Sequence, residues 1–246
     1  MGSGSGHLVG WNRLDWDSEF LSLEVYSTHL DQLGEMTTAG AFEELRTSGA
    51  DLVYARSTEE IDSRVVESFG GVLVDNKVSF VVDLGEVDYD QMGPGSVVVE
   101  PFDTSMPRRD LRALAIQSGE FSRFAIDQNI PRERFEAMYT IWIERSVDRQ
   151  IADEVLVVRE GDRVTGMVTL GDVDGQGDIG LIAVEAKSRG KRYGQSLVLG
   201  AQQYFLRNGY AEGRVVTQAR NIPACRLYRK CGYRLDKSEF VYHFWL

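Results

Sequence analysis

Residues 179–194 read Ile-Gly-Leu-Ile-Ala-Val, then Glu-Ala-Lys-Ser, then Arg-Gly-Lys-Arg-Tyr-Gly. The first six predict a strand at 179–184, and the apolar run that ends before Gly209 predicts a long helix at 190–208. A glycine-bearing turn that enters a helix presents unpaired backbone N–H groups at the positive end of the helix dipole. Such a turn binds phosphate well.

The turn itself contains three cationic side chains, those of Arg189, Lys191 and Arg192. The turn lacks both the Gly-Lys-Ser/Thr ending of a P-loop and the Gly-x-Gly-x-x-Gly fingerprint of dinucleotide-binding folds. We therefore expect it to hold a different pyrophosphate-bearing ligand.

The charge of the chain is concentrated around this turn. Residues 185–234 contain eleven Lys/Arg and two Glu, a net charge of +9, while the remainder has 16 basic and 36 acidic residues, a net charge of −20. A basic segment in an acidic protein favours a small anionic ligand over a long polyanion. Basic residues that merely solvate two helix faces are the alternative.

Composition narrows the remaining classes. The 246 residues are 43% hydrophobic and carry a net charge of −11, which predicts a globular protein that binds neither nucleic acid nor an anionic membrane. No apolar run approaches the roughly 18 residues of a membrane span. Cys225 and Cys231 form no zinc set, so we expect no metal and a cytoplasmic protein. Residues 1–10 are expected to be an added leader, because residues 1–6 alternate Gly and Ser after Met1.

A small N-terminal α/β domain is predicted over residues 11–95. Ser57 and Glu60 have the spacing of a helix capping box, and residues 75–77 are predicted to form a polar turn. The segment 85–96 contains Gly-Pro-Gly and is expected to be the linker between domains. The predicted elements are a strand at 52–55, a helix at 58–69, and strands at 72–74 and 78–84.

The second domain, residues 96–246, is predicted to be α+β, with a central, mixed, mostly antiparallel sheet flanked by helices. An apolar end at 240–246 would form the edge of a homodimer. The predicted strands are 97–101, 155–159, 164–170, 179–184, 214–217 and 240–245, and the predicted helices are 107–117, 131–147, 190–208 and 223–230.

The two halves share a strand–helix–glycine–strand order. Aligning Phe69-Gly70 with Cys231-Gly232 superposes these units, so the N-terminal one would be a degenerate copy of the other. Two similar units that arose independently would have the same order.

Two separate motifs resemble the Gcn5-related N-acetyltransferase (GNAT) superfamily. Residues 189–194 follow its Gln/Arg-x-x-Gly-x-Gly/Ala motif, with Arg192 where the family usually has glycine. The family's Asn-x₆-Tyr element, followed by a glycine and an aromatic residue, is present as Asn221, Tyr228 and residues 232–233.

The resemblance implies a GNAT fold and acetyl-CoA as cosubstrate. Its pyrophosphate would lie on the turn and its pantetheine arm along a splayed strand, with Asn221 holding the arm. The implied cofactor-binding residues are Ile182, Ala183, Val184, Arg189, Gly190, Lys191, Arg192, Tyr193, Gly194 and Asn221.

A closer resemblance covers nearly the whole chain. The chain is similar to the dTDP-fucosamine acetyltransferase group, which implies a dTDP-linked 4-amino-4,6-dideoxy sugar as the acceptor. The segments that carry this resemblance are 16–20, 121–124, 142–144, 179–184 and 217–218.

Amide formation from a thioester needs a neutral amine, a site for the oxyanion and a proton for the departing thiolate. Backbone N–H groups from Ile182 to Val184 would serve the oxyanion. Tyr228 would be the general acid, with Arg226 and Arg229 lowering its pKa. A tyrosine that only packs its ring is the alternative.

The general base remains open between a bound water, Asp127 and Glu144. His29 and His243 are expected to be structural. Cys225 and Cys231 are expected to pack helices rather than to act as nucleophiles, because no His–Asp/Asn set lies near them in sequence.

For the acceptor, Ser122, Arg123 and Phe124 combine a polar, a cationic and an aromatic side chain, which suits a sugar nucleotide. The closer resemblance adds Gln218. A phenylalanine that fills the core beside an exposed arginine is the alternative.

Two rival functions stay open. One changes the acceptor to a peptide N-terminus, a polyamine or an antibiotic amine, and a cationic acceptor would suit the net charge of −20 outside the basic segment. The other is an acyl-CoA-binding protein without turnover, which the Arg192 departure would favour.

Overall fold

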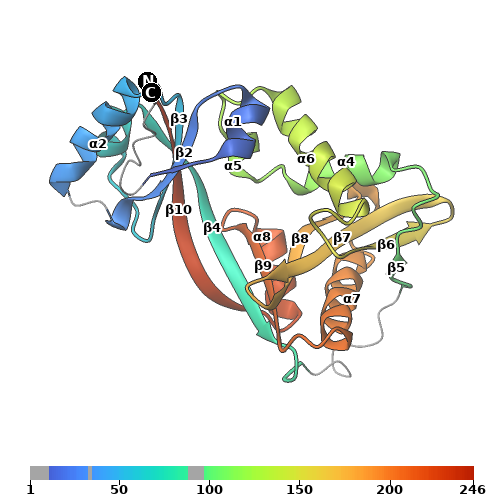
Figure 1. Ribbon diagram of the computed structural model, residues 1–246. Coiled ribbons are helices and arrows are strands. Elements are labelled where there is room, and N and C mark those ends of the chain that lie inside the picture. The colour runs from blue at the N-terminus through green and yellow to red at the C-terminus, as the bar shows by residue number, and fades with distance from the viewer. Residues whose placement is uncertain (1–10, 33–34, 88–96) are drawn as a thin grey trace. The chain divides into compact units, whose positions relative to one another are not determined.

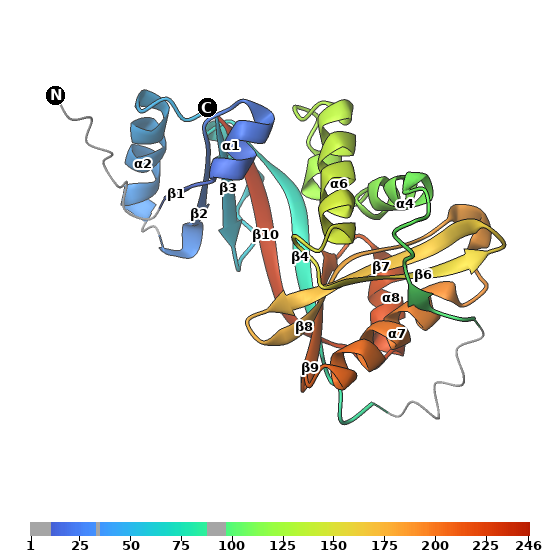
Figure 2. The same ribbon diagram turned by 45° about the vertical axis from the view of Figure 1, so that its right-hand side comes forward.

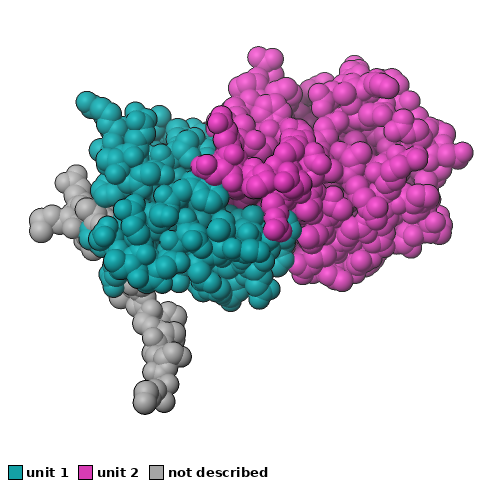
Figure 3. Space-filling model, turned by 90° about the horizontal axis from the view of Figure 1, so that it is seen from above, with its two compact units in different colours: residues 1–77, 238–246 teal, residues 78–237 magenta. Residues whose placement is uncertain are grey.

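The computed structural model describes residues 11–32, 35–87 and 97–246. The chain forms two compact units (Figure 3): unit 1 comprises residues 1–77 and 238–246, and unit 2 comprises residues 78–237. These units do not coincide with the predicted domains 11–95 and 96–246. Residues 88–96 of the expected linker and the expected leader 1–10 lie outside the described residues.

Unit 1 places a parallel strand pair beside two long strands. Strands β2 and β3 are parallel, and β10 pairs antiparallel with β3. The order of neighbouring strands is β1-β2-β3-β10-β4. The elements are β1 (Asn12–Arg13), α1 (Asp15–Leu21), β2 (Val25–His29), η1 (Leu30–Gln32), α2 (Glu35–Thr47), β3 (Leu52–Ser57), α3 (Ser63–Ser68), and parts of β4 (Gly71–Asp83) and β10 (Arg234–Trp245).

In unit 2 the strand order is β4-β9-β8-β7-β6-β5. Helices α4 and α6 cover one face of the β6–β8 strands, and α7 and α8 lie on the other side (Figure 2). The elements are β5 (Glu100–Pro101), α4 (Arg109–Ser118), α5 (Arg123–Ile126), α6 (Arg132–Val147), β6 (Glu154–Glu160), β7 (Arg163–Val173), β8 (Gln176–Val184), η2 (Ala186–Ser188), α7 (Tyr193–Arg207), β9 (Glu212–Gln218) and α8 (Ile222–Lys230). The predicted α+β fold with a mixed, mostly antiparallel sheet is confirmed.

The predicted helix 58–69 is wrong in its start. Ser57 ends β3, and its hydroxyl donates to Asp31 Oδ1 at 2.8 Å rather than capping a helix. Asp62 is the N-cap of α3, because its carboxylate accepts from the backbone N–H of Arg64 at 2.9 Å.

The predicted turn at 75–77 is also wrong, because β4 runs through it without a break. Its polar residues meet partners on β10: Asn76 accepts a hydrogen bond from Ser238 at 2.7 Å, and Lys77 pairs with Glu239 at 3.8 Å. Partners more than 160 residues away in sequence stabilise a strand here that local propensity does not predict.

The expected dimer edge at 240–246 is a central strand. This part of β10 lies between β3 and β4, its side chains Tyr242 and Phe244 pack in the core of unit 1, and Val241 is buried as well. A strand paired on both sides offers no edge to a second chain.

The two halves of the sequence repeat one order of elements (Figure 1). Each has a parallel pair, a short helix, a glycine with positive φ and a long strand: β2, β3, α3, Gly70 and β4, then β8, β9, α8, Gly232 and β10. In the sheet of unit 1, the parallel pair β2–β3 is flanked by β10, the long strand of the C-terminal half. In unit 2, the pair β8–β9 is flanked by β4, the long strand of the N-terminal half. Descent of one half from the other stays a prediction.

The core of unit 2 brings α7 against the sheet. Leu197, Val198 and Phe205 are fully buried and pack with Val168 and Val215 of the strands. No described helix has both the length and the apolar character needed to cross a membrane.

We expect Gly177→Ala to lower the free energy of unfolding by about 1–3 kcal/mol, because a Cβ at this β8 position would collide with the buried ring of Phe205. Gly171→Ala is the matched control, since its Cβ would meet Ala152 at an ordinary 3.9 Å. Urea unfolding of the two variants checks this. Equal stabilities would show that α7 does not pack this closely on β8.

Candidate acetyl-CoA site

Strands β8 and β9 are paired only at their beginnings. The parallel register ends at Ile179↔Val215, directly after Asp178 and Arg214, whose side chains form an ion pair at 3.2 Å. Both strands continue beyond this point, to Val184 and Gln218. The sheet therefore opens between them.

The backbone of β8 presents alternate groups to this opening. The N–H of Glu185 donates to Thr165 at 2.7 Å, toward β7, and β7 pairs in register with residues 182–184. Because strand residues alternate in direction, Ile182 and Val184 direct their N–H and C=O groups to the opposite edge, where β9 has diverged.

A bulge precedes these residues. The N–H of Leu181 donates to Thr169 Oγ1 at 2.8 Å, and a Cβ at Gly180 would lie 2.9 Å from that same oxygen. Gly180 thus allows the close approach that sets the direction of the exposed backbone.

The turn after β8 forms although Arg192 occupies the position where the resembling motif usually has glycine. Gly190 and Arg192 both adopt the left-handed conformation, with φ of 81° and 64°, and α7 starts at Tyr193. Arg192 therefore has the backbone geometry that glycine adopts at lower cost. The first N–H groups of α7 have no partner within the helix.

These elements enclose a cavity of about 540 Å³ in unit 2. Three cations line it, Arg189, Arg192 and Lys230, and none of the described lining residues is acidic. The lining includes Ile182, Ala183, Val184, Arg189, Gly190, Arg192, Tyr193, Gly194, Asn221 and Tyr228 of the sequence-predicted site. Polar groups, cations and volume together fit an anionic ligand with an apolar arm.

Lys191 is not among the lining residues. Its Nζ pairs with Glu160 Oε1 at 2.8 Å, and the hydroxyl of Tyr193 donates to the same oxygen at 2.8 Å. The neighbouring residues of the turn reach the cavity without it.

Helix α8 supplies the opposite wall. Asn221 is its N-cap and accepts from the N–H of Ala224 at 3.3 Å. Tyr228 lines the cavity yet is only 2% exposed, with its ring beside Phe80 and Tyr233.

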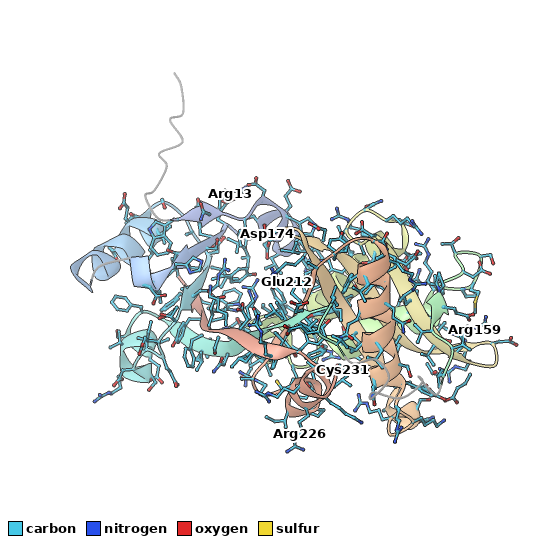
Figure 4. The ribbon with its side chains drawn as sticks, turned by 90° about the horizontal axis from the view of Figure 1, so that it is seen from below. Arg13, Arg159, Asp174, Glu212, Arg226 and Cys231 are labelled. Atoms are coloured by element: carbon cyan, nitrogen blue, oxygen red, sulfur yellow. The ribbon has the colours of Figure 1, made fainter. Side chains whose placement is uncertain are left out.

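The expectation that Arg226 and Arg229 lower the pKa of Tyr228 is wrong. Burial raises this pKa well above its usual value, with a further rise from Cys225 and Cys231. Arg226 points outward from α8 (Figure 4), and Arg229 lies over Phe80 at 5.3 Å. Burial likewise raises the pKa of the Cys231 thiol to about 12, so neither buried cysteine is an activated nucleophile.

The predicted acceptor residues lie elsewhere. Phe124 is buried against Trp142, with Arg123 stacked over its ring at 4.4 Å, an arrangement that favours the structural alternative. Ser122 is buried at the start of α5, and the carbonyl of Gln218 accepts from Cys225 Sγ at 3.6 Å. None of these four residues lines the cavity.

Neither candidate base lines the cavity either. Glu144 pairs with Arg108 and Arg112, and these partners hold its pKa below its usual value. Asp127 is buried and accepts from the N–H of Asn129 at 2.9 Å. His243 is buried against Tyr54. The described residues contain no cluster of His, Cys, Asp and Glu that could hold a metal ion.

Sequence reasoning missed part of the lining. The end of α4 contributes Gln117 and Ser118, with Phe121 beyond it, and Gln117 Nε2 donates to the carbonyl of Val184 at 2.8 Å. The remaining lining residues are Gln195, Pro223, Ala224, Leu227 and Lys230. A helical spacing of four from Tyr228 would have found Ala224, and a spacing of three from Ala224 would have found Leu227, whereas no local signal connects α4 with β8.

Replacing Arg192 separates its backbone role from its charge. Glycine avoids the left-handed cost, so we expect Arg192→Gly to be about 1 kcal/mol more stable than Arg192→Ala. Both variants lose one cation and should bind CoA roughly three- to tenfold more weakly. Urea unfolding and calorimetry check this. A less stable glycine variant would show that residue 192 leaves the left-handed region.

Comparison with known proteins supports this arrangement. Residues 121–233 match the family model described as "Acetyltransferase (GNAT) family". The chain is 25% identical over 146 residues to "Spore coat polysaccharide biosynthesis protein SpsD" of Bacillus subtilis (strain 168), covering 59% of this chain and 49% of that protein. It is 41% identical over 62 residues to "Streptothricin acetyltransferase" of Escherichia coli, covering 25% of this chain and 36% of that protein.

The chain thus spans about half the length of the first relative and 36% of the second. Among solved structures, a GCN5-related N-acetyltransferase from Sphaerobacter thermophilus superposes with a TM-score of 0.60 at 17% identity, over 95% of this chain and 75% of that one. This likeness shows the fold. Residues 121–233 are therefore similar in sequence to the GNAT family of acetyltransferases, and the fold of the chain agrees with that match.

Proposed function

We propose that this protein transfers an acetyl group from acetyl-CoA to the primary amine of a nucleotide-linked amino sugar, by direct attack in a ternary complex. The observation that carries the proposal is the opening between β8 and β9 beyond Ile179, which leads to the cation-lined start of α7. An apolar arm with two amides and a pyrophosphate at one end matches that combination of groups.

The cavity residues divide into three roles. Arg189, Arg192 and the first N–H groups of α7 would hold the pyrophosphate. The backbone groups of Ile182 and the N–H of Val184, which face the opening, would pair with the amides of the pantetheine arm and with the thioester oxygen. Bound acetyl-CoA would supply the acetyl group in the activated form of a thioester.

Tyr228 would be the proton donor for the leaving thiolate. Its raised pKa keeps the phenol protonated throughout the neutral range, so it is a donor and not a base. Transfer from such a phenol to a solvated thiol of pKa about 8.5 is uphill. Burial raises the pKa of the Cys231 thiol to about 12. Desolvation of the CoA thiolate beside Tyr228 would likewise raise the pKa of the CoA thiol and reduce its difference from the pKa of Tyr228.

The acceptor would enter beside the end of α4. The side-chain oxygens of Gln117 and Ser118 can accept hydrogen bonds there, while their donors bind the Val184 and Ala115 carbonyls. Phe121, which is 38% exposed, offers an aromatic face. The similarity to a spore coat polysaccharide biosynthesis protein supports a carbohydrate acceptor. From the resemblance to the dTDP-fucosamine acetyltransferase group, we infer a dTDP-4-amino-4,6-dideoxyhexose.

The match to a streptothricin acetyltransferase favours a second candidate, an antibiotic amine. The sequence identity to that acetyltransferase, 41%, is higher than the 25% to the spore coat protein, but it extends over only 62 residues. A binder without turnover is disfavoured by the left-handed geometry of Arg192, which preserves the turn, and by the place of Tyr228 in the cavity wall.

An acceptor panel tests the proposed function. With acetyl-CoA and the full chain, we expect release of free CoA thiol to be at least about 100-fold faster, as kcat/KM, with dTDP-4-amino-4,6-dideoxyhexoses than with streptothricin, spermidine or a peptide N-terminus. A preference for streptothricin would establish the antibiotic alternative. Tight CoA binding without thiol release from any amine would favour the non-catalytic one.

Tyr228→Phe should lower kcat by about 10²–10⁴-fold, because it removes the proton donor and keeps the buried ring. Tyr233→Phe is the matched control, a buried tyrosine of the same core outside the cavity lining. The wild-type rate should show no fall from Tyr228 deprotonation between pH 7 and 9, since its pKa is raised. Equal rates for the two variants would exclude Tyr228 as the acid.

A further inference from the structure

One carboxylate holds two residues of the phosphate-binding turn. Glu160, the last residue of β6, accepts hydrogen bonds at 2.8 Å from both Lys191 Nζ and the Tyr193 hydroxyl, and both bonds end on Oε1. The two donors lie on either side of Arg192, whose φ of 64° places it in the left-handed region. Glu160 therefore spans the strained residue of the turn.

The two sides of the turn face different surroundings. Arg189, Gly190 and Arg192 line the cavity, whereas Lys191 does not line it and binds Glu160. Tyr193 does both, because it lines the cavity and sends its hydroxyl to Glu160. The residue of the turn that points away from the cavity, Lys191, is thus one of the two that bind Glu160.

Stability alone gives little reason for this contact. The side chains of Glu160 and Lys191 are 39% and 48% exposed, and such surface ion pairs contribute little to folding. The hydrogen bonds from Lys191 and Tyr193 hold the pKa of Glu160 below its usual value, so the carboxylate is charged at neutral pH. A charged acceptor with two donors restricts the turn much more than it stabilises the whole protein.

We propose that Glu160 is a positioning residue for the phosphate-binding turn: through Lys191 and Tyr193 it fixes the conformation in which the N–H groups at the start of α7, with Arg189 and Arg192, face the cavity. The inference rests on the proposed function, because the ligand in question is the pyrophosphate of CoA. Lys191 acts in this account through Glu160 and makes no contact with phosphate.

A direct role of Lys191 in phosphate binding would predict the opposite change in CoA affinity when Glu160 is removed. If Lys191 were a direct phosphate ligand, Glu160 would compete with the phosphate for it, and removal of the carboxylate would tighten CoA binding. Removal of a negative charge near an anion site would also tighten binding. Positioning predicts weaker binding despite both effects.

Calorimetric titration of CoA into the full chain tests this. We expect Glu160→Ala to raise the Kd about tenfold and Glu160→Gln about threefold, since glutamine still accepts from Tyr193. Lys191→Met should raise it about threefold in the wild type and not at all in the Glu160→Ala background. The KM for acetyl-CoA should follow the Kd, with kcat unchanged.

Glu133→Gln is the charge-matched control, because Glu133 is exposed at the first turn of α6 and lies outside the cavity lining. Unchanged or tighter binding by Glu160→Ala would overturn the proposal. So would a loss from Lys191→Met that is equally large in both backgrounds, which would make Lys191 a direct ligand.

A second measurement needs no CoA. The N–H of Ser196 donates to Arg192 at 3.0 Å as the first bond of α7, and its hydrogen exchange should be faster in Glu160→Ala than in Glu133→Gln. Equal exchange would contradict the positioning role. If the wild type failed to bind CoA, the proposed ligand would be refuted. Faster exchange of the Ser196 N–H in Glu160→Ala would still establish that Glu160 orders the turn.

Discussion

The site depends on one interruption of backbone pairing. Strands β8 and β9 share hydrogen bonds as far as Ile179 and Val215 and then separate, which leaves the polar groups of Ile182 and Val184 without a neighbouring strand. Half-buried backbone groups cost free energy unless they are paired. Gln117 already satisfies the Val184 carbonyl from α4. A ligand with its own amides would pair with the groups that remain.

Local signals predicted the elements whose partners are local. The strand at 179–184 and the helices at 131–147 and 223–230 appear within a few residues of their expected ends, because apolar periodicity, Pro and Gly define them. The start of α3 was wrong since Asp31 binds Ser57 from 26 residues away. The turn at 75–77 was wrong because β10 supplies partners that no local pattern reveals.

The candidate site could likewise be predicted only where its residues lie close together in sequence. The turn and Tyr228 were found because their motifs are contiguous, and the structure brings them to one cavity. Lys191 has the right charge in the right segment, yet its partner Glu160 is 31 residues earlier. The α4 residues were missed in favour of Ser122, Arg123 and Phe124, because only the folded chain shows which side of that segment faces β8.

The place of β10 also bears on how the chain is made. Residues 240–245 occupy a central position in unit 1, between β3 and β4, and they leave the ribosome long after both of those strands. The first 77 residues therefore emerge long before the strand that completes their sheet. Unit 1 cannot complete its sheet before β10 has been made, and until then the facing edges of β3 and β4 are exposed to pairing with other chains.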